Sequence, residues 1–569
     1  MRPNILRIRI IFSCIFLIAF VLVFRLYVLQ VVKANSYSEI ADRQYKKPNS
    51  RLFNRGVISF KKKDGELVSA ATLRSGFILA VNPEIIKEPK EVFKKISALL
   101  PTLDENIFVN RASKVGDPYE EVAKHIDSET GEKIADLKIP GLNIFKENWR
   151  FYPGEKMSAH VLGLVAYKGN DLAGRYGLER FYEDNLKKNS PTSYVNFFTE
   201  VFLNIKDGIS HGEKSEADIV TTIEPSVEAF LENELEEINK KWSSDFTGGI
   251  IIDPKTGEIL AMAMYPSFDP NFFQEEKNSA IFSNPLVEDV YEMGSIIKPL
   301  TMAAGIDAGS VTPNTTYNDK GSIVINNKTI SNYDGKGRGV INMQEVLNQS
   351  LNTGAAFVVS TMGKEKFSQY MFNFGLGEKT GIDLPNEATG LVENLKSPRD
   401  IETATASFGQ GIAISPVATV RALSALANGG TLITPHLVSE IKYNSGISKK
   451  ISFPEGSRVL KPETSEMISR MLVKTVDGSI IEGKIKIPNY SVAAKTGTAQ
   501  IAKKEGGGYY DDRFLHSFFG YFPAYNPRFL VFLYTYYPKG IRFSSETLPL
   551  PFMDITKYLI NYYEIPPDR

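Results

Sequence analysis

The sequence predicts an α+β fold for the long region that follows residue 220. Apolar strand-like runs occur at both ends of this region, and helix-like segments occupy its middle. The composition is that of a folded protein, with 43% hydrophobic and 23% charged residues. We therefore expect a sheet assembled from both ends of the region, with helices layered on it.

Length, charge and cysteine count limit the number of domains, the kinds of partner and the kinds of catalytic chemistry that this chain can have. The 569 residues allow three or four domains of about 100 to 200 residues each. The 66 basic and 66 acidic side chains balance, so charge gives no reason to expect a nucleic-acid partner. The single cysteine, Cys14, excludes an intrachain disulfide, a thiolate zinc cluster and a redox pair. The five histidines form no HxxxH pair, so an enzyme of this sequence would use a hydroxyl or carboxylate nucleophile.

The amino-terminal segment predicts one transmembrane helix over residues 10–32, after a short tail of residues 1–9. Residues 10–24 contain no charge, and the apolar character resumes after Arg25, which gives enough length to cross about 30 Å of hydrocarbon. A cleaved signal peptide is the alternative, because three arginines precede the apolar run. Its small-x-small candidate, residues 34–36, lies too far past the run. Basic residues flank both ends of the span, so charge alone leaves the orientation open.

Residues 33–220 predict an irregular α+β module. Short β-like runs at 65–73 and 75–81 precede a helix-like charged stretch at 88–100. The segment 150–186 is rich in glycine and tyrosine, as is typical of turns that need a positive φ. We expect a pedestal or dimerisation-type domain that contacts partners, with packing or interface roles for Arg150, His160 and Glu179.

A second domain, residues 221–569, is expected after a polar stretch that precedes residue 220. It opens with a strand, a helix cap at Thr222 and an amphipathic helix with Pro225 near its start. Residues 246–266 then predict a hairpin, because two apolar runs are joined across the turn sequence DPKTG. Strand character returns near the carboxyl end, at 490–500, 517–523 and 528–538.

Three SxxK tetrads occur, at Ser59, Ser295 and Ser439, so the tetrad alone is weak evidence. The first precedes a run of lysines, and the third lies in a polar strand-like stretch. Ser295 differs because Gly294 allows a sharp turn before it and an apolar helix follows, with Pro299 in the first turn. This serine is thereby held near a helix amino terminus, where the helix dipole favours negative charge on an attacked carbonyl oxygen.

Lys298 lies one helical turn after Ser295 and on the same face. A serine and a lysine at this spacing can act as nucleophile and base if the amine is neutral, and burial or a second nearby cation would lower its pKa. Gly309 supplies a stop for the helix. The alternative is a helix cap with a surface lysine.

Of three KTG triplets, one lies in a strand context and begins at Lys495. Its glycine, Gly497, carries a cost within a strand, and close approach of a ligand to the backbone is one reason to tolerate it. Lys495 can offer a cation, and Thr496 and Thr498 can offer hydroxyls, to a substrate carboxylate. The other two triplets fall in the hairpin turn and in a loop, at Lys255 and Lys379.

Ser350 and Asn352 lie between these two elements, just before or at the start of another apolar helix. Alone, Ser-x-Asn carries almost no information. The order SxxK, SxN, KTG along one chain, however, is the known signature of class A β-lactamases and penicillin-binding proteins. The chain closely resembles a class B penicillin-binding protein, a monofunctional peptidoglycan D,D-transpeptidase. Within that family it is most similar to the septal, cell-division member.

The resemblance covers nearly the whole chain. It includes the segments RLYVLQVV, NRGVIS, RFYPGEKMSAHVLG, GLERFYEDNL, TTIEPSVE, GGIIIDPKTGEILAMAMYPSFDPN, RDIETATASFGQGIAISPVATVRALSALANGG and AAKTGTAQ. Three residues depart from the family pattern: Met293 replaces a proline, Leu351 a serine and Glu224 an aspartate. These departures remove no catalytic group, and Leu351 puts local helix packing in question more than chemistry.

The resemblance implies an α+β transpeptidase domain like that of penicillin-binding proteins and serine β-lactamases: an antiparallel sheet with helices on both faces and a helical subdomain. It implies that Ser295 attacks the carbonyl between two terminal D-alanines, that Lys298 accepts its proton, and that Ser350 relays this proton to the leaving amine. Asn352 would hold the substrate amide. The N–H groups of Ser295 and Thr498 would form the oxyanion hole. The terminal carboxylate would be bound by the KTGT segment, which comprises Lys495, Thr496, Gly497 and Thr498.

In that family the acyl-enzyme meets an amine of a neighbouring stem peptide, a β-lactam traps the same serine, and neither metal nor nucleotide is required. The resemblance also implies a single-pass membrane protein with its amino terminus inside, an extracytoplasmic catalytic domain and a polytopic glycosyltransferase partner. Two alternatives remain. One is a D,D-carboxypeptidase or β-lactamase-like hydrolase, with Glu387 or Glu393 available for deacylation. The other is a non-catalytic scaffold for wall synthesis.

Overall fold

The computed structural model describes residues 16, 17, 20, 25, 53–114, 116–169, 171–188, 216–444, 446–454, 456–503 and 506–569. The chain divides into two compact units, one made of residues 1–54, 74–149 and 189–210, the other of 55–73, 150–188 and 211–569. The span predicted over residues 10–32 lies outside the described residues, apart from four positions. No helix within the described ranges is long and apolar enough to cross a membrane.

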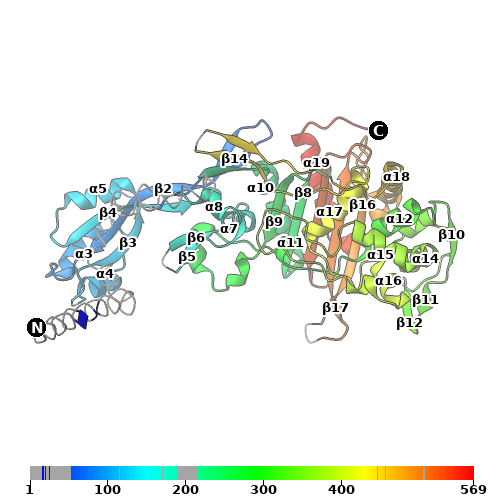
Figure 1. Cartoon of the computed structure of the whole chain (residues 1–569), viewed down its shortest axis with the longest axis horizontal. Helices are drawn as coiled ribbons and strands as arrows, with labels where there is room; N and C mark the ends of the chain where they lie inside the picture. The colour runs from blue at the N-terminus through cyan, green and yellow to red at the C-terminus, as the bar shows by residue number, and fades with distance from the viewer. Residues whose placement is uncertain are drawn as a thin grey trace, which may run out of the picture. The chain divides into compact units, whose positions relative to one another are not determined.

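The first unit has a small antiparallel sheet covered by short helices (Figure 1). Its elements are the second half of β2 (Leu67–Val81), α3 (Pro89–Ser97), α4 (Glu105–Ala112), β3 (Glu120–Ile126), α5 (Ser128–Asp136) and β4 (Leu142–Phe151). The helix predicted within 88–100 is α3, whereas the two β-like runs before it form one continuous strand, β2. Leu79, Ile96, Phe108 and Ile134 form the centre of its core.

The second unit contains a mixed sheet whose strands come from distant parts of the chain. Its order is β15 (Ser448–Lys450), β14 (Val438–Tyr443), β7 (Ala217–Thr221), β1 (Ile58–Lys61) and the first part of β2. β1 and β7 are parallel, and the other neighbours are antiparallel. Residues 55–73 and 150–188 therefore belong to the same compact unit as 211–569. A domain division near residue 220 stays a prediction.

A buried ion cluster joins two of these segments, 55–73 and 150–188. Arg55 and Arg150 each pair with one carboxylate oxygen of Glu179, and Arg55 also donates to the Glu179 carbonyl at 2.7 Å. Burial alone would raise the pKa of Glu179, but the two arginines hold it below its usual value. His160 is also buried and lies 3.0 Å from the Ile281 carbonyl through its Nε2 atom. Arg150, His160 and Glu179 thus make buried contacts within the unit.

The centre of the second unit is a five-stranded antiparallel sheet, in which the amino-terminal hairpin lies beside strands from the carboxyl end (Figure 1). The strand order is β16 (Ala493–Ala502), β17 (Tyr509–Phe522), β18 (Phe529–Tyr536), β8 (Phe246–Ile252) and β9 (Ile259–Tyr265). This arrangement confirms the predicted α+β class, the predicted hairpin and the assembly of the sheet from both ends.

Neighbouring side chains of each strand point to opposite faces of the sheet. Both faces are apolar here, and helices cover each of them. Ile251 and Phe518 face α10 (Pro225–Trp242) and α19 (Pro549–Tyr562) in one apolar cluster. The neighbouring residues Ile250 and Phe519 belong to the other cluster. That cluster includes side chains of α12 (Lys298–Asp307), α17 (Pro416–Ala427) and α18 (Pro462–Gly478).

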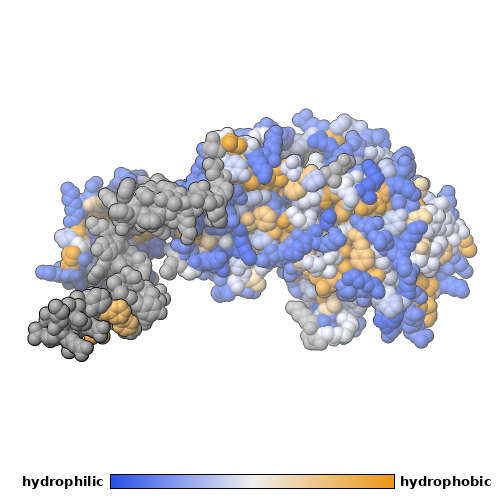
Figure 2. Space-filling view, in the orientation of Figure 1, coloured by the Kyte–Doolittle hydropathy of each residue, from blue (hydrophilic) through white to orange (hydrophobic). Residues whose placement is uncertain are grey.

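Shorter elements complete the second unit. Before β7 they are α6 (Ala159–Leu162), β5 (Val165–Lys168), β6 (Asp171–Gly174), α7 (Gly177–Phe181) and α8 (Glu183–Leu186). After β9 they are η2 (Pro270–Glu275), η3 (Ser279–Phe282), α11 (Pro285–Glu288), η4 (Gly294–Ile297), β10 (Thr316–Asp319), β11 (Ser322–Ile325), β12 (Lys328–Ser331), β13 (Gly339–Asn342), α13 (Met343–Asn348), α14 (Asn352–Met362), α15 (Lys364–Asn373), η5 (Glu393–Lys396), α16 (Asp400–Ala406), η6 (Ile480–Gly483) and η7 (Ser544–Glu546). The face shown in Figure 2 carries mainly hydrophilic residues over this unit, with smaller hydrophobic groups between them.

The helix cap predicted at Thr222 is wrong. Glu224 caps α10 instead, because its carboxylate accepts from the Val227 N–H at 2.8 Å while Pro225 occupies the first turn. The Thr222 hydroxyl donates to the Ile259 carbonyl on β9. Glutamate thus performs at position 224 the capping that an aspartate would, and the predicted place of Pro225 is confirmed.

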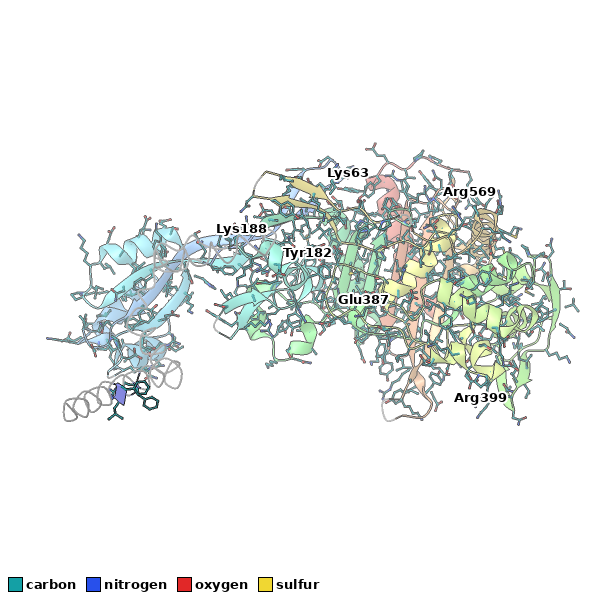
Figure 3. The ribbon with its side chains drawn as sticks, viewed as in Figure 1. Lys63, Tyr182, Lys188, Glu387, Arg399 and Arg569 are labelled. Carbon is teal, nitrogen blue, oxygen red and sulfur yellow. The ribbon has the colours of Figure 1, made fainter. Side chains whose placement is uncertain are left out.

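Long-range contacts also fix the turn between β1 and β2. Lys63, labelled in Figure 3, donates to the carbonyl of Tyr562 at 2.7 Å and lies 4.4 Å from the centre of its ring. Tyr182, also labelled there, donates to Asp383 at 3.1 Å. Residues of 55–73 and 150–188 therefore contact the last helix and the loop between α15 and η5 directly.

Candidate active site

Ser295 lies in a tight turn that two glycines make possible. Gly294 has φ +65°, and its N–H donates to the Gly409 carbonyl at 3.2 Å. A Cβ on Gly294 would lie 2.6 Å from the Thr498 carbonyl oxygen, and a Cβ on Gly409 would lie 2.2 Å from the Gly294 carbonyl oxygen. The turn enters η4 and then α12, which Gly309 follows with φ +70°. The predicted sharp turn and helix stop are therefore confirmed.

Lys495 lies inside β16, as predicted, whereas the KTG triplets at Lys255 and Lys379 lie outside strands. The structure gives a different reason for Gly497 from the one we expected. A Cβ at this position would lie 2.3 Å from the Ser517 hydroxyl oxygen and 2.8 Å from the Met293 carbonyl oxygen. The absence of a side chain at Gly497 thus lets the turn before Ser295 and the neighbouring strand β17 lie close to β16.

Ser350 and Asn352 lie at the start of α14, where the sequence placed them. Ser350 has a left-handed backbone, with φ +54°, which ends the preceding helix and directs its carbonyl and hydroxyl toward Lys298. Leu351 is fully buried, so this departure from the family pattern is accommodated by packing. Asn352 donates through its side-chain amide to the Ser331 carbonyl at 2.9 Å.

Two buried lysines meet at the Ser350 hydroxyl. Lys298 Nζ lies 2.5 Å from the Ser350 carbonyl oxygen and 3.2 Å from its Oγ atom. Lys495 Nζ approaches the same Oγ at 3.0 Å and also donates to the Thr496 carbonyl at 3.1 Å. In the part of the chain that the structure describes, the Ser295 hydroxyl makes no hydrogen bond, so it is available to a bound molecule.

Burial lowers the pKa of both lysine amines. Lys298 is 1% exposed and Lys495 is 2% exposed. Burial lowers the pKa of Lys298 well below its usual value, and the nearby Lys495 cation lowers it further. Burial lowers the pKa of Lys495 to about 7. Both effects favour the neutral amine of Lys298, which is the state that a base requires.

A cleft of about 340 Å³ joins the three motifs. The predicted residues that line it are Ser295, Ser350, Asn352, Lys495, Thr496 and Thr498. Lys298 reaches this group through Ser350, and Gly497 lies in β16 between two lining threonines. Neither Glu387 nor Glu393 lines the cleft. Glu387, labelled in Figure 3, instead accepts hydrogen bonds from the Thr380 hydroxyl at 2.6 Å and from the backbone of its own loop.

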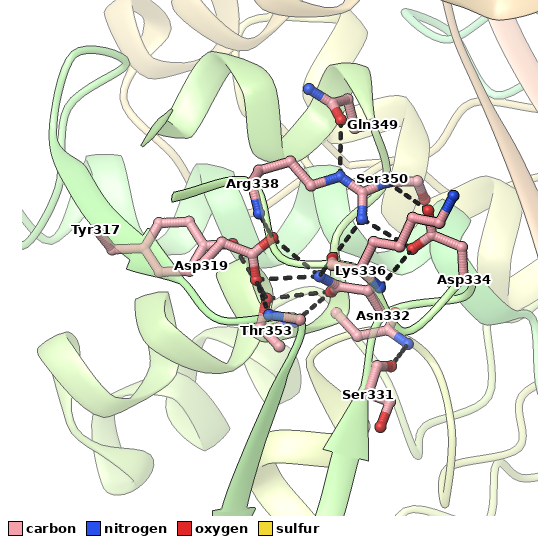
Figure 4. Close-up of polar contacts among 12 residues, drawn as sticks. Tyr317, Asp319, Ser331, Asn332, Asp334, Lys336, Arg338, Gln349, Ser350 and Thr353 are labelled. Atoms are coloured by element: carbon pink, nitrogen blue, oxygen red, sulfur yellow. Dashed lines mark hydrogen bonds and ion pairs between the residues drawn. The ribbon is translucent and has the colours of Figure 1, made fainter. Parts of the chain in front are cut away.

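A polar network fixes the start of α14 (Figure 4). The buried carboxylate of Asp319 accepts from the Thr353 hydroxyl at 2.8 Å and from the Asn332 side-chain amide at 3.0 Å. Asn332 in turn accepts from the Thr353 N–H at 3.2 Å. These bonds hold the segment that presents Ser350 and Asn352 to the cleft. Sequence reasoning missed this network, although the polar turn SNYDGKGRG was a signal that the segment is ordered by side-chain contacts.

Other residues that line the cleft had no signal in the sequence. Tyr333 and Phe543 come from two separate loops and meet edge to face, with ring centres 5.8 Å apart. Gln410 follows the glycine that contacts the Ser295 turn. Arg542 lies between Phe543 and Phe514. The residues add an aromatic and a cationic surface to the three motifs.

Comparison with known proteins agrees with this site. The family model described as the penicillin-binding protein transpeptidase domain matches residues 247–547, and that of the penicillin-binding protein dimerisation domain matches 55–196. The chain is 30% identical over 515 residues to stage V sporulation protein D of Bacillus subtilis, covering 87% of this chain and 77% of that protein. It is 27% identical over 567 residues to peptidoglycan D,D-transpeptidase FtsI of Buchnera aphidicola, covering 98% and 95%.

Solved structures share the fold. Penicillin-binding protein 2X of Streptococcus thermophilus gives a TM-score of 0.73 at 19% identity, over 90% of this chain and 80% of that one. Penicillin-binding protein 3 of Mycobacterium tuberculosis, in complex with aztreonam, gives 0.69 at 20% identity, over 92% and 98%. The fold and the matched domains define a serine-type transpeptidase of cell-wall synthesis. The chain belongs to the penicillin-binding proteins, and within them to class B.

Proposed function

We propose that this transpeptidase cross-links peptidoglycan stem peptides at the division septum through an acyl-enzyme on Ser295. The observation that carries this proposal is the convergence of two buried lysines on Ser350 Oγ, in the cleft that Ser295 lines. A neutral Lys298 can take a proton, and a charged Lys495 can hold a carboxylate, so one small site supplies both requirements of acyl transfer.

In the proposed first step, Ser295 Oγ bonds to the carbonyl carbon between two terminal D-alanines while its proton passes to Lys298 Nζ. The carbonyl oxygen becomes negative and is stabilised by the N–H groups of Ser295 and Thr498, each worth about 3 to 4 kcal/mol in such sites. Ser350 Oγ, which is 3.2 Å from Lys298 Nζ, relays the proton to the departing D-alanine amine. Breaking the C–N bond then leaves an ester on Ser295.

In the proposed second step, an amine from a neighbouring stem peptide attacks the ester carbonyl. Lys298 accepts a proton from this amine, the new amide bond forms while the ester C–O bond to Ser295 breaks, and the proton passes to the departing Ser295 Oγ. Asn352 orients the donor amide, and Lys495 with Thr496, Gly497 and Thr498 binds the terminal carboxylate in the first step. A β-lactam carries a strained amide and a carboxylate in similar positions, so we expect it to acylate the same serine.

A fluorescent penicillin tests the nucleophile. The purified full chain should become covalently labelled, and Ser295→Ala should abolish the label. Ser59→Ala is the matched control, because Ser59 begins another SxxK tetrad on β1 and should leave labelling unchanged. Labelling that survives Ser295→Ala would rule out the proposed role of Ser295, and no labelling of the wild-type chain would rule out the β-lactam part of the proposal.

Product analysis separates transfer from hydrolysis. With a donor stem peptide and an acceptor amine, a transpeptidase forms a new amide, whereas a carboxypeptidase releases the shortened donor acid. Glu387 and Glu393 lie outside the lining of the cleft, which favours transfer over a β-lactamase-like deacylation. A scaffold without catalysis would give neither product.

The proposal places the catalytic domain outside the cytoplasmic membrane, anchored by residues 10–32 with the amino terminus inside. The residues matched to the dimerisation domain would contact partners, among them a polytopic glycosyltransferase. One relative is named for a stage of sporulation, so a spore-specific role is the second candidate. Depletion in growing cells distinguishes them: a septal enzyme gives filaments, whereas a spore-specific one leaves vegetative division unchanged.

A further inference from the structure

Arg542 is an exposed cation on the wall of the catalytic cleft. Its guanidinium lies 5.4 Å from the ring centre of Phe543 and 5.9 Å from that of Phe514. Among the residues described, its side chain forms no ion pair. Aromatic faces restrain an arginine without neutralising it. Arg542 is therefore held in place with its charge available to a bound molecule.

The loop that carries Arg542 is attached to the catalytic strands. The Arg542 carbonyl accepts from His516 Nε2 at 3.1 Å, and the N–H of Ser544 donates to Thr498 Oγ1 at 3.0 Å. The Ser544 hydroxyl donates to the Ser517 carbonyl at 2.8 Å. Hydrogen bonds at Arg542 and at Ser544 thus hold this loop against β17 and β16.

The charge of the cleft indicates what Arg542 binds. Its lining, all of it within the described ranges, includes the cations Lys495 and Arg542 and no aspartate or glutamate. Lys495 would take the terminal carboxylate of the donor. A second cation in a cleft without acidic groups therefore favours a donor with a second anionic group.

The register of the sheet indicates where that group lies. β16 is the edge strand of the central sheet, and such an edge can bind an extended peptide alongside it. Phe514, on which Arg542 rests, pairs with Gln500, two residues beyond Thr498. At about 3.3 Å per residue, this is about 7 Å from the position at which the scissile carbonyl would lie, on the side away from Lys495.

We infer that Arg542 binds a carboxylate on the residue that precedes the terminal D-Ala-D-Ala of the donor and so selects donors that carry one. This inference rests on the proposed function, because it assigns a subsite of the same cleft. Arg542 acts on specificity and not on the acyl-transfer chemistry, so donors that lack the carboxylate gain nothing from it.

Two penicillins that differ by one carboxylate test the inference. Benzylpenicillin has a neutral acyl side chain, and its α-carboxybenzyl counterpart adds a carboxylate there. Arg542→Gln should slow acylation of the full chain by the carboxylated compound about tenfold and leave the rate with benzylpenicillin within about twofold. Synthetic donor peptides whose third residue bears a carboxylate or the matching carboxamide should show the same difference.

Arg528→Gln is the matched control. Arg528 is also exposed and lies 5.7 Å from the ring centres of Phe529 and Tyr563, but it is not among the residues that line the cleft. Its substitution should leave both rates unchanged. Equal slowing with both penicillins would assign Arg542 to loop structure and overturn the inference, as would no slowing with either. If neither penicillin acylates the wild-type chain, the β-lactam part of the proposed function fails, and the pair of donor peptides then decides the role of Arg542.

Discussion

Lys298 and Lys495 direct their side-chain nitrogens to one oxygen atom, Ser350 Oγ, at 3.2 and 3.0 Å. Two ammonium groups at such positions would repel each other strongly in a buried site, so one of them stays neutral at neutral pH. Burial together with the Lys495 charge lowers the pKa of Lys298 well below its usual value, whereas that of Lys495 falls to about 7. The proton is therefore held by Lys495.

This asymmetry predicts a bell-shaped pH profile for acylation by benzylpenicillin. The rate should rise as pH increases through the pKa of Lys298, because the base must be neutral. It should fall above the pKa of Lys495, about 7, because the cation that holds the carboxylate is lost. The two apparent pKa values belong to the coupled pair. Stopped-flow acylation between about pH 5 and 10 measures both limbs.

Lys495→Arg provides the control for this profile, since a guanidinium stays charged over the whole range. The alkaline limb should move beyond pH 9 while the acid limb remains, even if the maximal rate falls. An alkaline limb unchanged in this variant would assign that limb to another group.

A methyl group at position 497 is predicted to impair the site. In Gly497→Ala the added Cβ would lie 2.3 Å from Ser517 Oγ and 2.8 Å from the Met293 carbonyl, so β16 or the Ser295 turn must move. We expect a loss of stability of about 1 to 3 kcal/mol and at least about tenfold slower acylation. Thermal unfolding and penicillin labelling measure the two effects.

Gly478→Ala is the matched control, because a Cβ there meets no atom within 4 Å at the end of α18. It should leave labelling unchanged and stabilise the chain slightly, since alanine is the better helix former. If Gly497→Ala behaves like this control, the close approach of the Ser295 turn is not required.

The sequence was sufficient for those parts of the site that depend on local pattern. Gly294 and Pro299 mark the turn and helix start around Ser295, and the strand-like run YSVAAKTGTAQ places Lys495 in a strand. The three motifs could be assigned to one site because their order along the chain is distinctive. The strand and the helices that carry these motifs were predicted from apolar runs and from the turn residues beside them.

The other parts of the site and of the fold depend on contacts between residues far apart in the sequence, which no local sequence pattern predicts. Asp319 and Thr353 come from separate segments, and only the folded chain brings them within 2.8 Å. Thr222 and Glu224 can both cap a helix, and the choice between them is made by the Ile259 carbonyl, which engages the Thr222 hydroxyl. Arg542 looked like any other loop arginine until the sheet register placed it beside the cleft.

The buried ion cluster is predicted to stabilise the second unit strongly. Glu179→Gln leaves Arg150 buried without a counter-charge and Arg55 with Glu183 alone, and the loss of a buried pair typically costs about 3 to 5 kcal/mol. Denaturant unfolding of the full chain measures it. Glu466→Gln is the control, because its pair with Arg470 is exposed and should contribute less than about 0.5 kcal/mol. A cost for Glu179→Gln as small as this control would contradict the prediction.

Two neighbouring glutamates on α10 predict a pH-dependent stability. Glu228 is fully buried; its carboxylate accepts from the Ser158 hydroxyl at 2.7 Å and the Met262 N–H at 2.8 Å. Glu232 accepts from the Ser158 N–H at 2.8 Å. Burial raises the pKa of Glu228 well above its usual value, and the nearby Glu232 raises it further. Burial raises the pKa of Glu232 from 4.5 to about 7.

Because both pKa values are raised in the folded chain, the favourable contribution of these groups is complete below about pH 4.5 and is lost as pH rises through about 7. In Glu228→Gln one charge is removed, the amide oxygen can accept from the Met262 N–H, and the NH2 group can donate to Ser158 Oγ. The variant should therefore stabilise the chain by about 1 to 3 kcal/mol at pH 8 and hardly at all at pH 5. Thermal unfolding at the two pH values measures this difference. Glu237→Gln, an exposed position on the same helix, should change neither value. Destabilisation by Glu228→Gln at pH 8 would show that the carboxylate is needed there in its charged form.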